Sequence, residues 1–225
     1  MLRLGSKYEI EHVRAEAIRR LRRTFPDSLD RFDSSADRDT ITHRLRYGLV
    51  LAPPSRVLLI RLDPGDIIAV INLARMYQLD SLLPAAFYEC PQLDETVWMR
   101  GYTQKTDQPR LSVEDIVRCI RGRERLCEAT RDAYHFFLWG PFDDCENESM
   151  CTFVFSDQAN EIWGAVEGLS GALRSNDMSF LEICNTCLDR AKHHWDVKRS
   201  ETWDSLRDYF DLPPLGRYEI GRAHV

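Results

Sequence analysis

Apolar residues recur at every third or fourth position along most of this chain, which is the spacing of one face of an α-helix. A helical pattern begins only four residues from the start, and its apolar stripe comprises Ile10, Val13, Ala17 and Leu21. Pro26 is expected to end this helix, because proline disfavours helical geometry at the residue before it. The chain therefore opens with an amphipathic helix and almost no preceding segment.

The same pattern predicts two helices in the middle of the chain, with a short joint between them. "DIIAVINLARMYQL" begins at a capping aspartate, Asp66, and "SLLPAAFYEC" follows a second one, Asp80. Pro84 falls in the first turn of the second helix, where proline is tolerated. The pair predicts an αα-hairpin. "VLLIRL" (57–62) is the best strand candidate, but it has no evident partner and is interpreted as an extended connector.

Five more helices are expected in the second half. Ser112 and Asp115 resemble a capping box, and Gly122 is placed to end that helix with positive φ. A helix over Arg123–Leu138 follows, and the remaining three are expected to be capped by Ser156, Asp177 and Ser200. About eight helices and no convincing sheet predict a mainly α fold, an irregular bundle.

Charge and composition narrow the class of protein. The net charge is −6 with both signs interspersed, which disfavours a nucleic-acid footprint over the whole molecule. Residues 1–23 hold seven Lys and Arg against three Glu, a basic face that is either solvated or used to bind nucleic acid. No apolar stretch is long enough to span a membrane and no signal peptide is recognisable, so we expect a cytoplasmic or nuclear protein without a membrane partner.

Four of the seven cysteines form two closely spaced pairs in the second half. Five residues separate Cys145 from Cys151, and two residues separate Cys184 from Cys187. Zinc binds four thiolates tetrahedrally, so the pairs together predict a structural zinc site in a reducing compartment. We expect the first pair in a polar loop after Leu138, the second pair on one helix face, and the four sulfurs within about 4 Å of one another.

Two alternatives to four-cysteine coordination stay open. The four residues can be packed free thiols without a metal, because cysteines three apart on a helix are often core residues. His193 or His194 can replace one cysteine as a ligand. For enzymatic chemistry no catalytic residues are predicted; Cys90 and Cys127 are the weak candidates for reactive thiols, and a buried, inert role is favoured for Cys90.

Several segments taken in order resemble the helical region that follows the BTB/POZ fold in proteins of mushroom-forming fungi. They are "LRLGSKYEIEHVRAEAIRRLRRTFP", "DIIAVINLARMYQLDSLLPAAFYEC", "LSVEDIVRCIRGRERL" and "ICNTCLDRAKHHWDVKRSETWDSLRDYFDLPP". The resemblance implies tail helices of a BTB-type fold at 1–26, a following helical region at 27–139 and a cysteine-containing helical region at 140–216. The BTB core itself is expected upstream of residue 1, missing or truncated here.

The resemblance also implies a function in protein interaction. BTB proteins act as adaptors, some of them for cullin ubiquitin ligases, and homodimerisation is expected only with the BTB core. We therefore expect a non-enzymatic protein-binding module, with a zinc-stabilised nucleic-acid-binding regulator as the alternative. Residues 217–225 are expected to be a disordered or artefactual tail, because "EIGRAHV" resembles a translated sequencing-library adapter.

Overall fold

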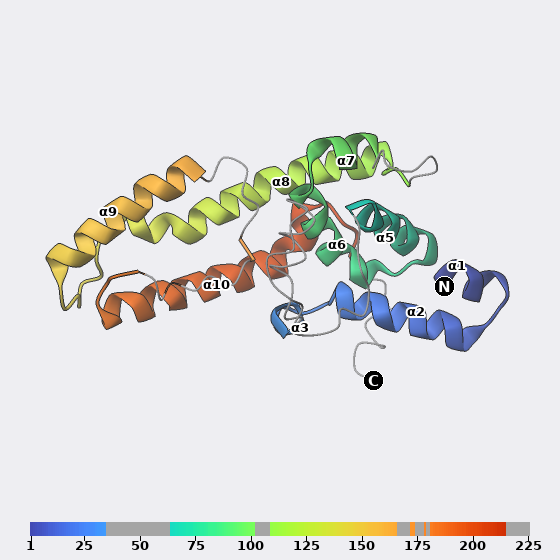
Figure 1. Ribbon diagram of the computed structural model, residues 1–225, viewed down its shortest axis with the longest axis horizontal. Helices are drawn as coiled ribbons and strands as arrows, with labels where there is room; N and C mark the ends of the chain where they lie inside the picture. The colour runs from blue at the N-terminus through green and yellow to red at the C-terminus, as the bar shows by residue number, and fades with distance from the viewer. Residues whose placement is uncertain (35–63, 102–108, 166–171, 174–177, 179–180, 215–225) are drawn as a thin grey trace. The chain divides into compact units, whose positions relative to one another are not determined.

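A computed structural model describes residues 1–34, 64–101, 109–165, 172–173, 178 and 181–214. Over these residues the chain forms nine α-helices and no strand, so the predicted mainly α fold is confirmed (Figure 1). The expected connector at 57–62 and the expected tail at 217–225 lie outside the described residues. In the part of the chain that is described, no helix is both long and apolar enough to cross a membrane.

The chain divides into two compact units. The first unit comprises Met1–Ile120 together with Phe210–Val225, and the second comprises Arg121–Tyr209. Helix α8 (Val113–Tyr134) begins in the first unit and continues into the second.

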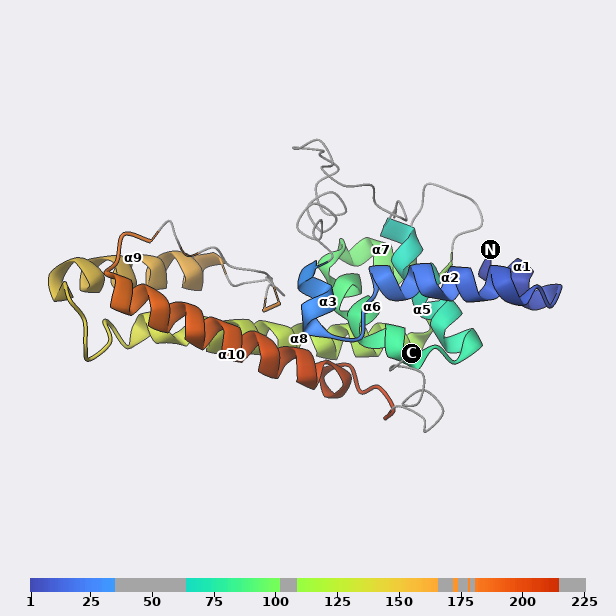
Figure 2. The same cartoon turned by 90° about the horizontal axis from the view of Figure 1, so that it is seen from below.

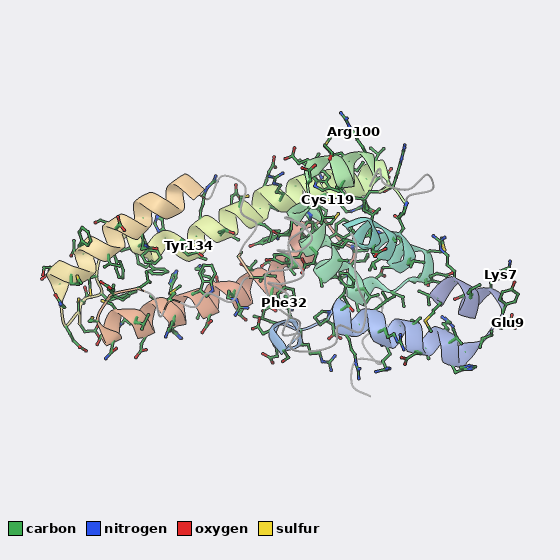
Figure 3. All side chains as sticks on the ribbon, viewed as in Figure 1. Lys7, Glu9, Phe32, Arg100, Cys119 and Tyr134 are labelled. Atoms are coloured by element: carbon green, nitrogen blue, oxygen red, sulfur yellow. The ribbon has the colours of Figure 1, made fainter. Side chains whose placement is uncertain are left out.

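The N-terminal helical pattern forms two helices, α1 (Leu2–Lys7) and α2 (Glu11–Thr24). Glu9 lies between them with a φ of 54°, which ends α1 and reverses the chain (Figure 3). Gly5 permits the two helices to pack closely, since a Cβ there would lie 2.8 Å from the backbone nitrogen of Arg14. Helix α2 ends one residue before Phe25, as Pro26 predicts, and α3 (Leu29–Ser34) follows.

The predicted αα-hairpin is present in the first unit. Helix α5 (Pro64–Tyr77) is joined by a short 3-10 turn to α6 (Leu83–Glu89), and α7 (Glu95–Arg100) follows. The core side chains of this region are fully buried and include Ile67, Ile68, Ile71, Leu82, Leu83 and Phe87. These helices gather beside the N-terminal part of α8 (Figure 2).

Helix α8 differs from its predicted form. Ser112 accepts a hydrogen bond from the Asp115 amide at 3.1 Å, so half of the expected capping box is present. The expected helix end at Gly122 is wrong, because α8 continues unbroken from Val113 to Tyr134. Buried residues on both sides, Cys119 and Leu126, continue one apolar stripe, and that burial outweighs the cost of about 1 kcal/mol for a glycine within a helix.

The second unit places α9 (Glu148–Ala165) and α10 (Asn185–Tyr209) alongside the C-terminal part of α8 (Figures 1 and 2). The predicted helix starts at Ser156 and Ser200 are wrong, because both serines lie inside longer helices. Ser200 is exposed, and a continuous buried face runs through α10 past it, formed by Cys187, Ala191, Trp195, Arg199, Thr202 and Leu206. Asp177 lies outside the described residues.

An aromatic core fills the second unit. The ring of Phe155 on α9 lies 6.1 Å from that of Phe136 and 5.3 Å from that of Phe137, and the ring of Tyr134 lies 4.5 Å from that of Trp195. Tyr134 ends α8 (Figure 3) and leads into the short 3-10 helix His135–Leu138. Two of the paired cysteines, Cys151 and Cys187, belong to this buried core.

Candidate metal centre

The four paired cysteines come from three places in the second unit. Cys145 lies in the loop before α9, Cys151 in the first turn of α9, Cys184 immediately before α10 and Cys187 in the first turn of α10. The expected placement of Cys151 in a loop and of Cys184 on a helix is therefore wrong. Both errors arise at helix starts: α9 begins eight residues before the expected serine cap, and α10 begins one residue after Cys184.

The sulfur atoms of these four cysteines, hereafter the cysteine cluster, lie close together. All four Sγ atoms lie within 4.8 Å of one another, and those of Cys145 and Cys184 are 3.8 Å apart. Four thiolates at about 2.3 Å from a tetrahedral zinc ion would have their sulfurs about 3.8 Å apart. The largest separation is wider than the expected 4 Å, and it is still small enough for one ion to reach all four sulfurs after a small contraction.

Backbone amides surround the cluster as hydrogen-bond donors. The Cys184 amide donates to Cys151 Sγ at 3.3 Å, and the Cys187 amide donates to Cys184 Sγ at 3.5 Å. The backbone amides of Glu146 and Phe142 also favour the thiolate forms of Cys184 and Cys187 respectively. Donors aimed at sulfur stabilise thiolate and fix ligand orientation, which is what outer-shell groups do around bound metals.

These donors and the burial set the acidity of the thiols in opposite directions. The amide of Cys187, with further help from that of Glu146, lowers the pKa of Cys184 from 9.0 to about 6. Burial raises the pKa of Cys151 and that of Cys187. Without a cation the two buried thiols therefore keep their protons. A bound dication would supply the charge that makes all four thiolates favourable, and its binding would release those protons.

The cluster is asymmetric in its exposure to solvent. Cys151 and Cys187 are fully buried, whereas Cys145 and Cys184 are half-buried. On the solvent side, Arg190 donates to Asp144 at 2.6 Å, which ties the loop before α9 to α10. Thr186 likewise donates to Glu146 at 2.5 Å.

Neither candidate histidine belongs to the cluster. His193 is exposed. His194 packs its ring 5.3 Å from that of Phe136 and 5.7 Å from that of Trp139, and burial lowers its pKa. The set of four nearby ligand atoms consists of the cysteine sulfurs.

The cysteines of the first unit have a different environment. Cys90 and Cys119 are both fully buried, as expected for Cys90, and a hydrogen bond with Cys119 together with burial raises the pKa of Cys90. Cys127, in the second unit, is half-buried and lies outside the cluster. A raised pKa keeps the Cys90 thiol protonated and makes it a poor nucleophile.

The basic face of α2 is partly neutralised within the helix. Arg19 and Arg20 each contact Glu16 at 2.7 Å, and Arg14 contacts Glu11 at 3.5 Å. The hydrogen bonds from both arginines lower the pKa of Glu16 to about 2, so this carboxylate stays charged. Three of the arginines that suggested nucleic-acid binding therefore have acidic partners one turn away.

All four cysteines of the cluster were expected from the sequence, but the backbone amides of Phe142 and Glu146 that favour their thiolate forms were not. Every residue type except proline presents a backbone N–H, so no side-chain signal marks these two positions.

Comparison of the chain with models of protein families, with curated proteins and with solved structures gives no match. The resemblance to BTB proteins stays a prediction, and the cysteine cluster is the feature on which a functional proposal can be built.

Proposed function

We propose that this chain is a non-enzymatic protein-binding module whose second unit is held together by one structural zinc ion. The observation that carries the proposal is the convergence of four sulfurs within 4.8 Å from three separate segments. The role of the ion is to join the loop at Cys145, the start of α9 at Cys151 and the start of α10 at Cys184 and Cys187.

The donor set favours zinc in a structural role. Four cysteine thiolates suit zinc and iron, whereas magnesium and calcium prefer oxygen ligands. Four protein ligands also complete a tetrahedron, which leaves no open position for a substrate or a reactive water. The inferred ion therefore stabilises the fold and carries out no reaction.

The loop before α9 explains why a metal would be needed. Asp143, Asp144, Glu146 and Asn147 are all exposed, so this stretch buries little apolar surface, whereas Phe142 just before it packs against Phe155. Its ion pair to Arg190 is solvent-exposed on both sides and contributes little to stability. A zinc ion at Cys145 would fix the polar part of the loop, residues 143–147, by coordination.

Cobalt substitution tests the coordination directly. We expect metal-free full-length chain to take up one Co²⁺ with the intense visible absorption of tetrahedral thiolate coordination, and Zn²⁺ to displace it. Cys187→Ser should abolish this spectrum, while Cys127→Ser, a half-buried cysteine outside the cluster, should leave it unchanged. A weak octahedral spectrum, or the same spectrum in the Cys187→Ser variant, would contradict the proposal.

Exposed apolar side chains in the second unit support the proposal that the chain binds another protein. Met150 and Phe153 are one turn apart on the solvent-facing side of α9, and Phe153 is 69% exposed. The opposite side of the same helix carries the buried Cys151 and Phe155. A metal that fixes the start of α9 would also fix the position of these two exposed side chains.

A comparison of partner binding by the wild-type chain and by a Phe153→Ser variant tests the protein-binding proposal. The zinc-loaded chain should retain a specific protein partner that Phe153→Ser loses without losing zinc. Failure of the wild-type chain to hold any stable partner across a range of conditions would count against a binding role.

We further propose that the chain is the helical region that follows a BTB fold, on the strength of the ordered segments quoted above. The genomic sequence upstream of the Met1 codon tests this: an in-frame BTB core is expected there. An upstream reading frame coding for an unrelated domain would refute the family proposal and leave the zinc proposal intact.

A further inference from the structure

We propose that Cys145 and Cys184 form an oxidant-sensitive edge of the cysteine cluster, where a peroxide joins the two sulfurs in a disulfide and thereby releases the metal. This inference rests on the proposed zinc site and adds a means of regulating it.

Exposure and distance single out this edge. Cys145 and Cys184 are the half-buried members of the cluster, and their sulfurs are 3.8 Å apart. Cys151 and Cys187 are fully buried in the aromatic core behind them. A small oxidant arriving from solvent therefore reaches the outer pair first, and the first oxidised sulfur already has a second thiolate next to it.

The chemistry balances with hydrogen peroxide as the oxidant. One outer thiolate attacks a peroxide oxygen, the O–O bond breaks, and the sulfur becomes a sulfenic acid as the departing hydroxide takes a proton to give water. The second outer thiolate attacks that sulfur, the S–O bond breaks as the disulfide forms, and the departing hydroxide takes a proton from solvent to give a second water. The two sulfurs lose two electrons in total, and the peroxide gains them.

Release of zinc follows from the ligand count. The disulfide removes two of the four thiolates, and Cys151 and Cys187 alone cannot complete a tetrahedral shell.

The two forms of the cluster connect different parts of the second unit. Zinc would tie the loop, α9 and α10 to one point, because its ligands come from all three. The disulfide ties only Cys145 of the loop to Cys184 at the start of α10. Helix α9 loses its link through Cys151, so oxidation loosens the helix that carries the exposed Met150 and Phe153.

Other cysteines are poorer targets for the same reaction. Cys90 and Cys119 are fully buried in the first unit. Cys127 is half-buried but is not a member of the cluster. We therefore expect a single disulfide, between the two outer members of the cluster.

The experiment treats zinc-loaded full-length protein with a small molar excess of hydrogen peroxide. Released zinc is followed with a chromogenic chelator, and disulfides are mapped by mass spectrometry of non-reduced peptides. We expect one zinc ion per chain to be released together with one Cys145–Cys184 disulfide, and a dithiol reductant with added Zn²⁺ to restore the starting state. Cys127→Ser should behave like the wild-type chain.

The outcomes separate the two proposals. Purified chain that binds no zinc before oxidation overturns both. Bound zinc that survives the peroxide, or zinc released with a Cys151–Cys187 or Cys90–Cys119 disulfide, overturns the oxidation proposal alone and leaves the zinc site standing.

Discussion

The two units bury cysteines in contrasting ways. In the first unit Cys90 and Cys119 are side chains of an apolar core, and the largest influence on the Cys90 pKa is its hydrogen bond with the other thiol. In the second unit the sulfurs of Cys151 and Cys184 accept hydrogen bonds from backbone amides, and the pKa of Cys184 falls to about 6, although burial raises the pKa of Cys151 and Cys187. The residue type is the same, but Cys90 is suited to stay protonated, whereas Cys184 is suited to become a thiolate.

This difference indicates how a metal-binding cysteine can be distinguished from a packed one. Burial alone favours the neutral thiol, because desolvation disfavours the charged form. Amide donors favour the thiolate, and a donor placed one turn into a helix, as at Cys187, comes with the helix start. Proximity of sulfurs together with aimed amides therefore carries more weight than burial of a cysteine pair.

Metal removal should produce the largest difference between the units. A chelator is expected to lower the melting temperature of the second unit and to speed amide hydrogen exchange at residues 142–151 and 184–190. Structural zinc in small peptides contributes an apparent 10–16 kcal/mol or so, which is an upper bound here because the aromatic core remains. Exchange at 67–88 in the first unit is the internal control. Equal loosening of both units would contradict a local metal.

The second-largest difference is expected between substitutions of a cluster cysteine and of an equally buried cysteine in the first unit. Cys151→Ala removes a metal ligand as well as core packing, so the loss in unfolding free energy should exceed the roughly 1 kcal/mol typical of a single core change. Cys90→Ala, equally buried, should cost about 1 kcal/mol and leave metal content unchanged. Chemical denaturation in the presence of zinc measures both. Equal costs for the two variants would remove the proposed distinction.

The first unit depends instead on an ion-pair network. Asp115 is 4% exposed and accepts hydrogen bonds at 2.9 Å from Arg75 on α5 and from Arg118 on α8. Asp115→Asn keeps the shape but removes the charge, and should cost about 1–3 kcal/mol, since both arginines are partly exposed. Denaturant unfolding measures the loss, and zinc content should stay as in the wild type. No loss of stability would show that the network is dispensable.

The smallest expected effect concerns the acidity of the Cys184 thiol, with the fold unchanged. In metal-free protein, alkylation of Cys184 by iodoacetamide should rise with pH and reach half its maximum near pH 6. The lowered pKa also adds stability that is fully present above the unfolded value of 9.0 and is lost as pH falls through about 6. Peptide mass spectrometry measures the rate at this residue. A midpoint at or above 9 would mean that the amide donors do not act on the sulfur.

The helical class and several helix ends could be predicted from short-range patterns. Pro26 ends α2 because its effect is local, and Ser112 caps α8 for the same reason. Gly122, Ser156 and Ser200 lie inside helices and do not bound them, because burial along a long helix face outweighs the preference of one residue.

The cysteine cluster shows what spacing alone can and cannot predict. The two pairs stand out in the sequence, and the spacing of each pair limits how far apart its members can be. Whether the pairs meet depends on how α9 and α10 pack on α8, a long-range arrangement that the sequence does not display. The effect of the Phe142 and Glu146 amides on the cysteine pKa values depends on that arrangement as well.

Zinc stoichiometry is the measurement that tests the central claim most directly. Full-length chain and the variants C90A/C119A and C151A/C187A are purified in the presence of zinc, desalted, and analysed by plasma mass spectrometry for zinc per chain. The account predicts one zinc ion in the wild type, one in C90A/C119A, and none in C151A/C187A. Zinc-free wild-type protein, or zinc retained at one per chain in C151A/C187A, would contradict it.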